Sequence, residues 1–252
     1  MKQKNWLNSI KEKLGFPEYS YRPALITFLS YLLTYTLPQV IHLGIAPRKV
    51  AIAWDAMIPF WPPAVIVYVL SYFQWLLIIG VVMRQRRELC ERIFRSVTIA
   101  LWISFFIFIF LPTYVIRPEI TGNGICDWIL RFVYAVDAPT RVLPSFHVIA
   151  SWFCTRALFL CCDSQEKYGF AGDDPKRNGI TGGDPRRSFG KCTRPWAWVN
   201  LIFSILVFVS ILLVKQHVIL DIPSALIVTE LGFLLEKLWP KKNGNDAIPG
   251  SN

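Results

Sequence analysis

The sequence predicts an all-α fold, a polytopic membrane bundle of six transmembrane helices. Hydrophobic residues make up 54% of the 252 positions, and they are grouped into long runs rather than spread with an amphipathic period. Each run is close to the roughly 20 residues that a helix needs to cross about 30 Å of hydrocarbon, where a helix satisfies its own backbone hydrogen bonds. The six predicted spans are Leu25–Leu43, Ile58–Met83, Val97–Val115, Leu143–Cys162, Trp196–Val214 and Val218–Leu238.

Basic residues predict the orientation of this bundle. The net charge of +10 would by itself suit nucleic acid, but most of the 27 Lys and Arg residues fall in segments on one side of the predicted spans. This asymmetry is the positive-inside pattern of membrane proteins. It predicts membrane lipids and no nucleic acid as partners, and a multi-pass protein of the cell membrane with both termini cytoplasmic. The outer segments hold only Arg48, Lys49, Arg117, Arg131, Arg141 and Lys215.

The chain divides into three predicted parts. Residues 1–23 form a cytoplasmic N-terminal segment whose apolar side chains recur on one helical face, as in a helix lying on the inner membrane surface. Residues 24–239 form the six-span domain. Residues 240–252 form a cytoplasmic tail.

Three connecting segments have distinct compositions. The basic segment from Arg84 to Arg95 is predicted to be a linker that binds anionic headgroups at the inner surface. The segment from Cys126 to Val136 alternates aromatic and charged residues, which predicts an amphipathic helix on the outer surface. The polar stretch from Asp163 to Pro195 is predicted to be a cytoplasmic loop.

The same topology assigns the six cysteines. Cys126 is the one that lies in an outer loop, and the other five lie within a span or at the inner side. Because disulfides persist in oxidising compartments, the sequence predicts no disulfide framework.

Two charged residues lie deep within apolar runs, Arg156 in the fourth span and Glu230 in the sixth. Charges inside a membrane tend to pair with one another. We therefore predict that these two side chains meet between their helices in a structural role.

Three pieces of the chain carry candidate chemistry, each where an apolar run meets a polar loop: Arg117-Pro118, residues 144–147, and His217 with Asp221. All three fall on the predicted outer side. His217 and Asp221 are four residues apart, so on a helix they share one face. A carboxylate that accepts a proton from one imidazole nitrogen leaves the lone pair of the other free. Such a histidine is a good nucleophile or base, and His147 opens the fourth span beside it.

Polar and cationic side chains at the same edge predict an anion site. Arg117, Lys215 and Ser145 all lie there. Arg and Lys at a partly dry edge favour phosphate strongly. The sequence shows no cluster of metal ligands, so neither a metal nor a cofactor is expected.

The three pieces resemble the motifs of the type-2 phosphatidic acid phosphatase superfamily of lipid phosphate phosphatases, which are KxxxxxxRP, PSxH and SRxxxxxHxxxD. This chain has Arg117-Pro118 for the first, an intact PSFH at residues 144–147 for the second, and Ser210, His217 and Asp221 for the third. The resemblance implies a metal-independent phosphatase whose last four spans form the catalytic core. Its substrate would be a lipid phosphate monoester or pyrophosphate, bound at the outer face.

The resemblance also implies the role of each residue. His217 would attack phosphorus to give a phosphohistidine, Asp221 would orient it, and His147 would protonate the leaving oxygen and later activate water. The residues implied to stabilise charge on the transferring phosphoryl group are Arg117, Ser145 and Phe146, the last through backbone N–H groups.

Two motif cations are missing from this chain. Phe110 stands where the first motif has Lys, and Ile211 stands where the third has Arg. Lys215 and Arg141 are the candidates to replace them.

Three other interpretations remain open. With two motif cations missing, the arrangement is also similar to the inositol phosphorylceramide and sphingomyelin synthase branch of the family, where a lipid alcohol replaces water as acceptor. A transporter or channel with a His/Asp proton relay would instead need ionisable groups at mid-depth along a path. Finally, the two histidines would be plain helix-end residues if they made only local hydrogen bonds.

Overall fold

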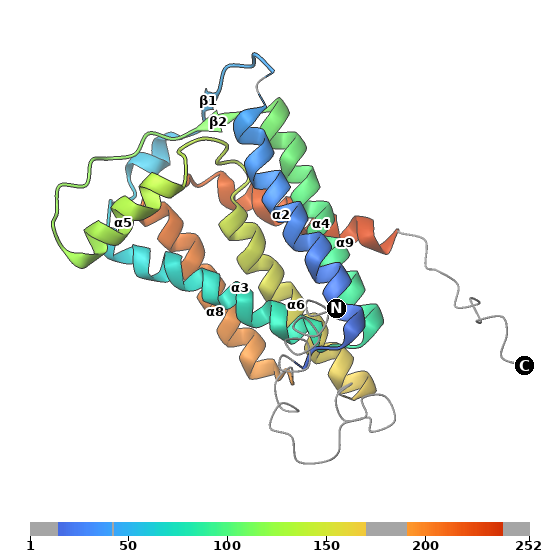
Figure 1. Cartoon of the computed structure of the whole chain (residues 1–252). Coiled ribbons are helices and arrows are strands. Elements are labelled where there is room, and N and C mark those ends of the chain that lie inside the picture. Colours follow the sequence, from blue (N-terminus) through green and yellow to red (C-terminus); the bar gives the residue numbers. More distant parts are fainter. Residues whose placement is uncertain (1–14, 42, 170–190, 239–252) are drawn as a thin grey trace, which may run out of the picture.

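A computed structural model describes residues 15–41, 43–169 and 191–238, most of which are helical. Four segments are long and apolar enough to cross a membrane (Figure 1). They are the 3-10 turn η2 (Pro62–Ala64) with α3 (Val65–Met83), then α4 (Arg87–Phe110), α6 (Phe146–Tyr168) and α8 (Arg194–Leu213). The prediction of a mostly helical chain is therefore confirmed, and these four segments are consistent with a membrane protein.

Two further helices correspond to the first and sixth predicted spans. Helix α2 (Glu18–Val40) and helix α9 (Asp221–Lys237) are not among the candidate spans. Helix α9 has 17 residues, which gives a length of about 25 Å at 1.5 Å per residue. In α2, tyrosine and threonine side chains dilute the apolar run.

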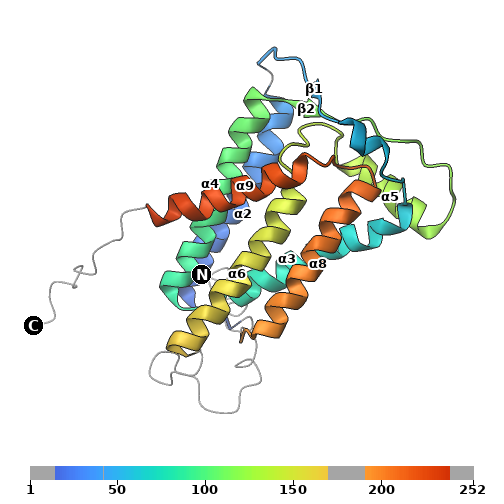
Figure 2. The same cartoon turned by 180° about the vertical axis from the view of Figure 1, so that it is seen from behind.

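The helices pack around α6 and α4. Helix α2 packs on α4, α3 and α8 pack on α6, and α9 packs on both α4 and α6. Both views show α9 crossing the bundle steeply rather than running along α4 (Figures 1 and 2). At the crossing, Gly232 lies against the backbone carbonyl of Ser96.

Helix α4 begins at Arg87, well ahead of the predicted span at Val97. The prediction of a basic linker at this point was wrong, because most of the segment is helical. Two of its arginines share one carboxylate: Glu236 of α9, 6% exposed, lies 3.2 Å from Arg92 and 3.1 Å from Arg95. The three side chains tie the beginning of α4 to the end of α9.

The C-terminal end of α4 also differs from the prediction. The helix ends at Phe110 rather than Val115, since Pro112 lacks the N–H that would continue it. Strand β2 (Thr113–Tyr114) follows and pairs in parallel with strand β1 (Arg48–Lys49).

The predicted amphipathic helix after this strand is confirmed as α5 (Ile125–Val136). Its apolar side chains include Trp128 and Phe132, which are 65% and 67% exposed. Leu130 and Val133 are buried on the opposite face. The helix therefore presents an uncovered aromatic face beside the bundle.

The predicted ion pair between α6 and α9 is also confirmed. Nε of Arg156 lies 2.8 Å from Oε1 of Glu230. The indole N–H of Trp152 donates to the same oxygen at 2.8 Å. The two charges thus pair with each other between α6 and α9.

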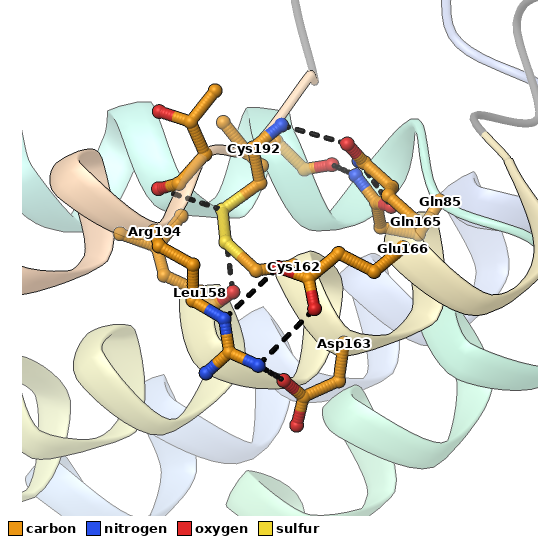
Figure 3. Close-up of a disulfide and its surroundings, with 10 residues drawn as sticks. Gln85, Leu158, Cys162, Asp163, Gln165, Glu166, Cys192 and Arg194 are labelled. Carbon is orange, nitrogen blue, oxygen red and sulfur yellow. Dashed lines mark hydrogen bonds and ion pairs between the residues drawn. A yellow bond between two sulfur atoms is a disulfide. The ribbon is translucent and has the colours of Figure 1, made fainter.

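The sequence predicts no disulfide framework, and the structure contains a disulfide between Cys162 and Cys192 (Figure 3). The compartment argument gave no weight to the fold, which brings the end of α6 against the beginning of α8, with the two Cα atoms 5.1 Å apart. That spacing lies within the usual disulfide range. Figure 3 shows Arg194 beside the bond, paired with Asp163 at 2.8 Å and Glu166 at 3.0 Å.

Alkylation of the unfolded protein without reduction should therefore modify four cysteines: Cys90, Cys126, Cys154 and Cys161. Reduction before alkylation should raise this number to six. Mass spectrometry of protein isolated from cells lysed in the alkylating reagent makes the measurement. Six modified cysteines without reduction would show that the bond does not form in the cell. Four modified cysteines would show that the bond forms in the cell.

Parts of the predicted cytoplasmic segments lie outside the described residues. These parts are residues 1–14 of the N-terminal segment, residues 170–190 of the loop, and residues 239–252 with the tail. At the two ends of the predicted loop, α6 continues to Tyr168 and α8 begins at Arg194.

Candidate functional site

A cavity of about 260 Å³ lies at the end of the bundle where α6 begins. Its wall comes from α2, α3, α4 and α6, from the loop before α6, and from the turn between α8 and α9. The lining side chains are mostly aromatic or polar: Tyr31, Tyr35, Gln39, Tyr72, Phe108, Val136, Asp137, Ala138, Thr140, Arg141, Val142, Phe146, His147, Gln216 and His217.

His217 and Asp221 form the hydrogen bond that the sequence predicts. Nδ1 of His217 lies 2.7 Å from Oδ2 of Asp221, a fully buried carboxylate that also accepts from the backbone N–H of Val218 at 3.1 Å. The helical basis of the prediction was wrong: His217 lies in the turn between α8 and α9, and Asp221 is the first residue of α9. The pairing makes Nδ1 the protonated nitrogen and leaves the lone pair on Nε2.

His147 faces His217 across the cavity. It is the second residue of α6, and the centres of the two imidazole rings are 5.9 Å apart. Its Nε2 lies 3.3 Å from the hydroxyl oxygen of Tyr72, and its ring lies 4.2 Å from that of Tyr68. Two histidines that are far apart in the sequence thus share one small cavity.

The turn that carries His217 is fastened to the segment before α3. Nζ of Lys215 donates to the carbonyl oxygens of Asp55 and Ile58, at 2.8 and 2.6 Å. The Asp55 carboxylate accepts in return from the backbone N–H of Ile219 at 2.8 Å. The hydroxyl of Tyr134 in α5 donates to the carbonyl of Val214 at 2.6 Å. Lys215 therefore holds the turn and does not line the cavity, contrary to its predicted phosphate-binding role.

Arg117 is likewise placed apart from the cavity lining. Its guanidinium donates to the backbone carbonyls of Tyr134 and Asp137, at 3.1 and 2.7 Å, and lies 4.5 Å from the centre of the Tyr134 ring. Desolvation by burial lowers the pKa of Arg117, and the nearby Asp137 carboxylate opposes this shift. The motif arginine thus fixes the backbone at Asp137 rather than facing His217.

The other three predicted phosphate-binding residues stand at the beginning of α6. Ser145 is fully buried and caps the helix, accepting from the backbone N–H of Val148 at 3.4 Å. Phe146 lines the cavity, as does Arg141. Desolvation lowers the pKa of Arg141. Arg141 and the N-terminus of α6 thus lie on the same cavity. Backbone N–H groups at a helix N-terminus attract anions.

The backbone is unusual at both replacement cations. Among the described residues other than glycine, Arg141 and Lys215 are those with positive φ, at 58° and 54°. Such conformations cost energy for residues with a Cβ and concentrate at functional sites. Of the two, the described cavity wall includes Arg141 alone.

The positions of the missing motif cations are apolar and offer no anion ligand. Phe110 ends α4 and is 57% exposed, and Ile211 is fully buried in α8. A phosphate in this cavity therefore meets fewer cations than the resemblance implies.

Sequence reasoning missed Asp137, whose carboxylate accepts from the hydroxyl groups of Tyr35 and Tyr68 at 2.8 and 3.1 Å. The amide of Gln216 lies 3.5 Å from the same carboxylate. An acidic residue a few positions before the PSFH segment was the one available signal. The tyrosines carry none, since aromatic residues make up 15% of the chain.

No group of three or more His, Cys, Asp or Glu in residues 15–41, 43–169 and 191–238 is placed to hold a metal ion. The comparisons with known proteins add no relative: no protein-family model, no curated protein and no solved structure matches the chain. The two facing histidines with their carboxylates are therefore the observations from which a function is argued.

Proposed function

We propose that the chain is a membrane phosphatase that hydrolyses a lipid phosphate monoester or pyrophosphate through a phosphohistidine at His217. The observation that carries the proposal is the 2.7 Å hydrogen bond from His217 to the buried Asp221, beside a cavity that His147 shares. A histidine with its Nδ1–H held by a carboxylate keeps a nucleophilic lone pair on Nε2.

In the first step, the lone pair on Nε2 of His217 forms a bond to phosphorus. The P–O bond to the lipid breaks, its electron pair stays on the lipid oxygen, and His147 supplies the proton that this oxygen takes. In the second step, His147 removes a proton from water, whose oxygen attacks phosphorus and releases phosphate from His217. Arg141 and the N-terminal N–H groups of α6 would stabilise the negative charge of the phosphoryl group.

The proposal includes the finer architecture. Helices α2 and α9 cross the membrane with the four apolar segments to give six spans, of which the last four form the catalytic core. In this proposal both termini lie in the cytoplasm and the cavity at the outer face, as the positive-inside rule favours for this distribution of basic residues. The exposed aromatic face of α5 would lie in the outer interface beside the cavity.

Transfer to a lipid alcohol is a second candidate. It is favoured by the cavity wall, in which Arg141 is accompanied by the carboxylate Asp137 and many aromatic rings. A wall of this kind suits an apolar acceptor better than a cage of three cations would. The acceptor distinguishes the two reactions, because an added lipid alcohol would capture the phosphoryl or phospho-headgroup.

The transporter alternative has less support. The buried polar side chains that continue from His147 between α3, α6 and α8 form hydrogen bonds with one another and carry no ionisable group: Gln74, Ser151, Thr155, Asn200 and Ser204. A proton relay would need titratable groups there. Interhelical hydrogen bonds of this type instead hold membrane helices together.

The test is release of inorganic phosphate by purified protein in detergent and lipid, with EDTA present. The panel contains phosphatidic acid, phosphatidylglycerophosphate and polyprenyl diphosphate. Release with EDTA from at least one lipid supports the proposal. If the chain releases nothing, and added lipid alcohols capture nothing either, the site is not a phosphotransfer site.

A further inference from the structure

We propose that Asp137 is the charged partner of His147, acting through the hydroxyl groups of Tyr68 and Tyr72. The pairing is the counterpart of the direct one between His217 and Asp221. This inference rests on the proposed function, in which His147 is the acid and base. In it Asp137 is a positioning residue, since it acts on the reaction through His147.

A chain of polar groups connects Asp137 to His147. The Tyr68 hydroxyl donates to Oδ2 of Asp137 at 3.1 Å, and the Tyr72 hydroxyl lies 3.3 Å from Nε2 of His147. The two tyrosines are four residues apart on α3, and their ring centres lie 6.2 Å apart. A hydrogen bond from the Tyr72 hydroxyl to the Tyr68 hydroxyl would complete the chain, in which Nε2–H donates to Tyr72, Tyr72 to Tyr68, and Tyr68 to the carboxylate.

The path is enclosed by the protein at Tyr68, whereas Tyr72 is 40% exposed. Tyr68 is fully buried and its ring packs on the imidazole of His147. Arg117 holds the backbone carbonyl of Asp137 at 2.7 Å, and Tyr35 holds its other carboxylate oxygen at 2.8 Å. A hydrogen-bond chain removed from water transmits charge more effectively than an exposed one.

This arrangement assigns the two nitrogens of His147. With Nε2 bonded to Tyr72, Nδ1 is the nitrogen that gives its proton to the leaving oxygen. The electron pair of the broken P–O bond becomes the new O–H bond, and the imidazolium becomes neutral. The negative charge on Asp137 favours the cation before this transfer. It also favours recovery of the cation when His147 takes a proton from water.

His217, Tyr68, Tyr72 and Asp137 are the titratable groups that face His147 from the elements packed against it. The others that line the same cavity are Tyr31, Tyr35 and Arg141. Asp137 is the one carboxylate in the described lining. Its replacement by a neutral residue therefore removes the negative charge from this wall of the cavity.

The experiment compares two phosphate monoesters, an alkyl phosphate and an aryl phosphate. The alkoxide leaving group needs a proton, whereas the phenolate leaves readily without one, so a defect in the general acid appears only with the first. Asp137→Asn and Tyr72→Phe should each lower kcat on the alkyl phosphate by about 10- to 100-fold. The loss on the aryl phosphate should be less than about 3-fold, since acid catalysis contributes little there.

Tyr35→Phe is the matched comparison. It removes a hydroxyl bonded to the same carboxylate but outside the path to His147, so any loss should be equal on the two substrates. The alkaline limb of the kcat profile should also move to lower pH by about one unit in Asp137→Asn and not in Tyr35→Phe. The shift is downward because a general acid works only while protonated, and loss of the carboxylate charge disfavours that form.

The outcomes separate this inference from the proposed function. Wild-type protein inert on both esters and on the lipid panel would remove the proposed function itself. Active wild-type protein with equal losses on both esters in Tyr72→Phe would assign Tyr72 a structural role and overturn the inference. Tyr72 is 40% exposed, and its substitution removes a single oxygen, so this variant stays informative even if Asp137→Asn fails to fold.

Discussion

His217→Ala should reduce phosphate release by at least about 1,000-fold, since it removes the nucleophile and not merely a group that assists it. Wild-type protein mixed with a substrate labelled in the transferred phosphate and stopped with detergent at alkaline pH should carry label on the chain. A phosphohistidine survives base and is lost in acid. His217→Ala should carry none. Label that resists acid, or label that persists in the variant, would contradict the assignment of the nucleophile.

Asp221→Asn is the matched variant for the same experiment. The amide has the size of the carboxylate, but it lacks the negative charge opposite the ring, and its NH2 group, if turned toward Nδ1, would impose the other tautomer of His217. Release should fall by about 100-fold or more while substrate binding changes little. A loss confined to KM would mean that the carboxylate serves binding instead of orientation.

Much of the fold follows from the run lengths in the sequence. Apolar runs of about 20 residues fix where helices lie, and Arg156 and Glu230 pair as two lone charges in such runs should. The helix ends were less predictable. Arg87 to Arg95 looks like a surface linker until Glu236, far along the chain, is seen to neutralise it. The contact of Cys162 with Cys192 has the same cause, since it depends on how α6 and α8 meet.

The residues of the site likewise fall into those that the sequence could predict and those that it could not. His217, Asp221 and His147 could be found because their spacing has a chemical meaning within the motifs. Where Arg117 and Lys215 point could not be found, because each is directed at backbone carbonyls that tertiary structure places nearby. A sequence shows that a cationic side chain lies at the end of an apolar run. It does not show whether backbone carbonyl oxygens nearby already bind that side chain. Asp137 was missed because its hydrogen-bond partners come from three different segments of the chain, which only the folded structure brings together.

The largest structural effect should come from Gly232, where α9 crosses α4. A Cβ at this position would lie 2.4 Å from the backbone oxygen of Ser96 and 3.0 Å from Cβ of Ala100. The carbonyl belongs to the α4 helix and cannot rotate away as a flexible side chain would. Gly232→Leu must therefore separate the two helices, at a cost of about 3 kcal/mol or more. Gly232→Ala should cost less but remain clearly destabilising.

Thermal unfolding of the purified protein in detergent makes the measurement, with Leu231→Ala as the control. Leu231 is the neighbouring residue on α9 and is 39% exposed, so its truncation should change the midpoint little. Separation of α9 from α4 would also displace Asp221, the first residue of α9, and with it the orientation of His217. Phosphate release by Gly232→Leu should therefore fall even below its unfolding temperature. Unfolding midpoints equal to wild type for both Gly232 variants would show that α9 does not pack on α4 through this glycine.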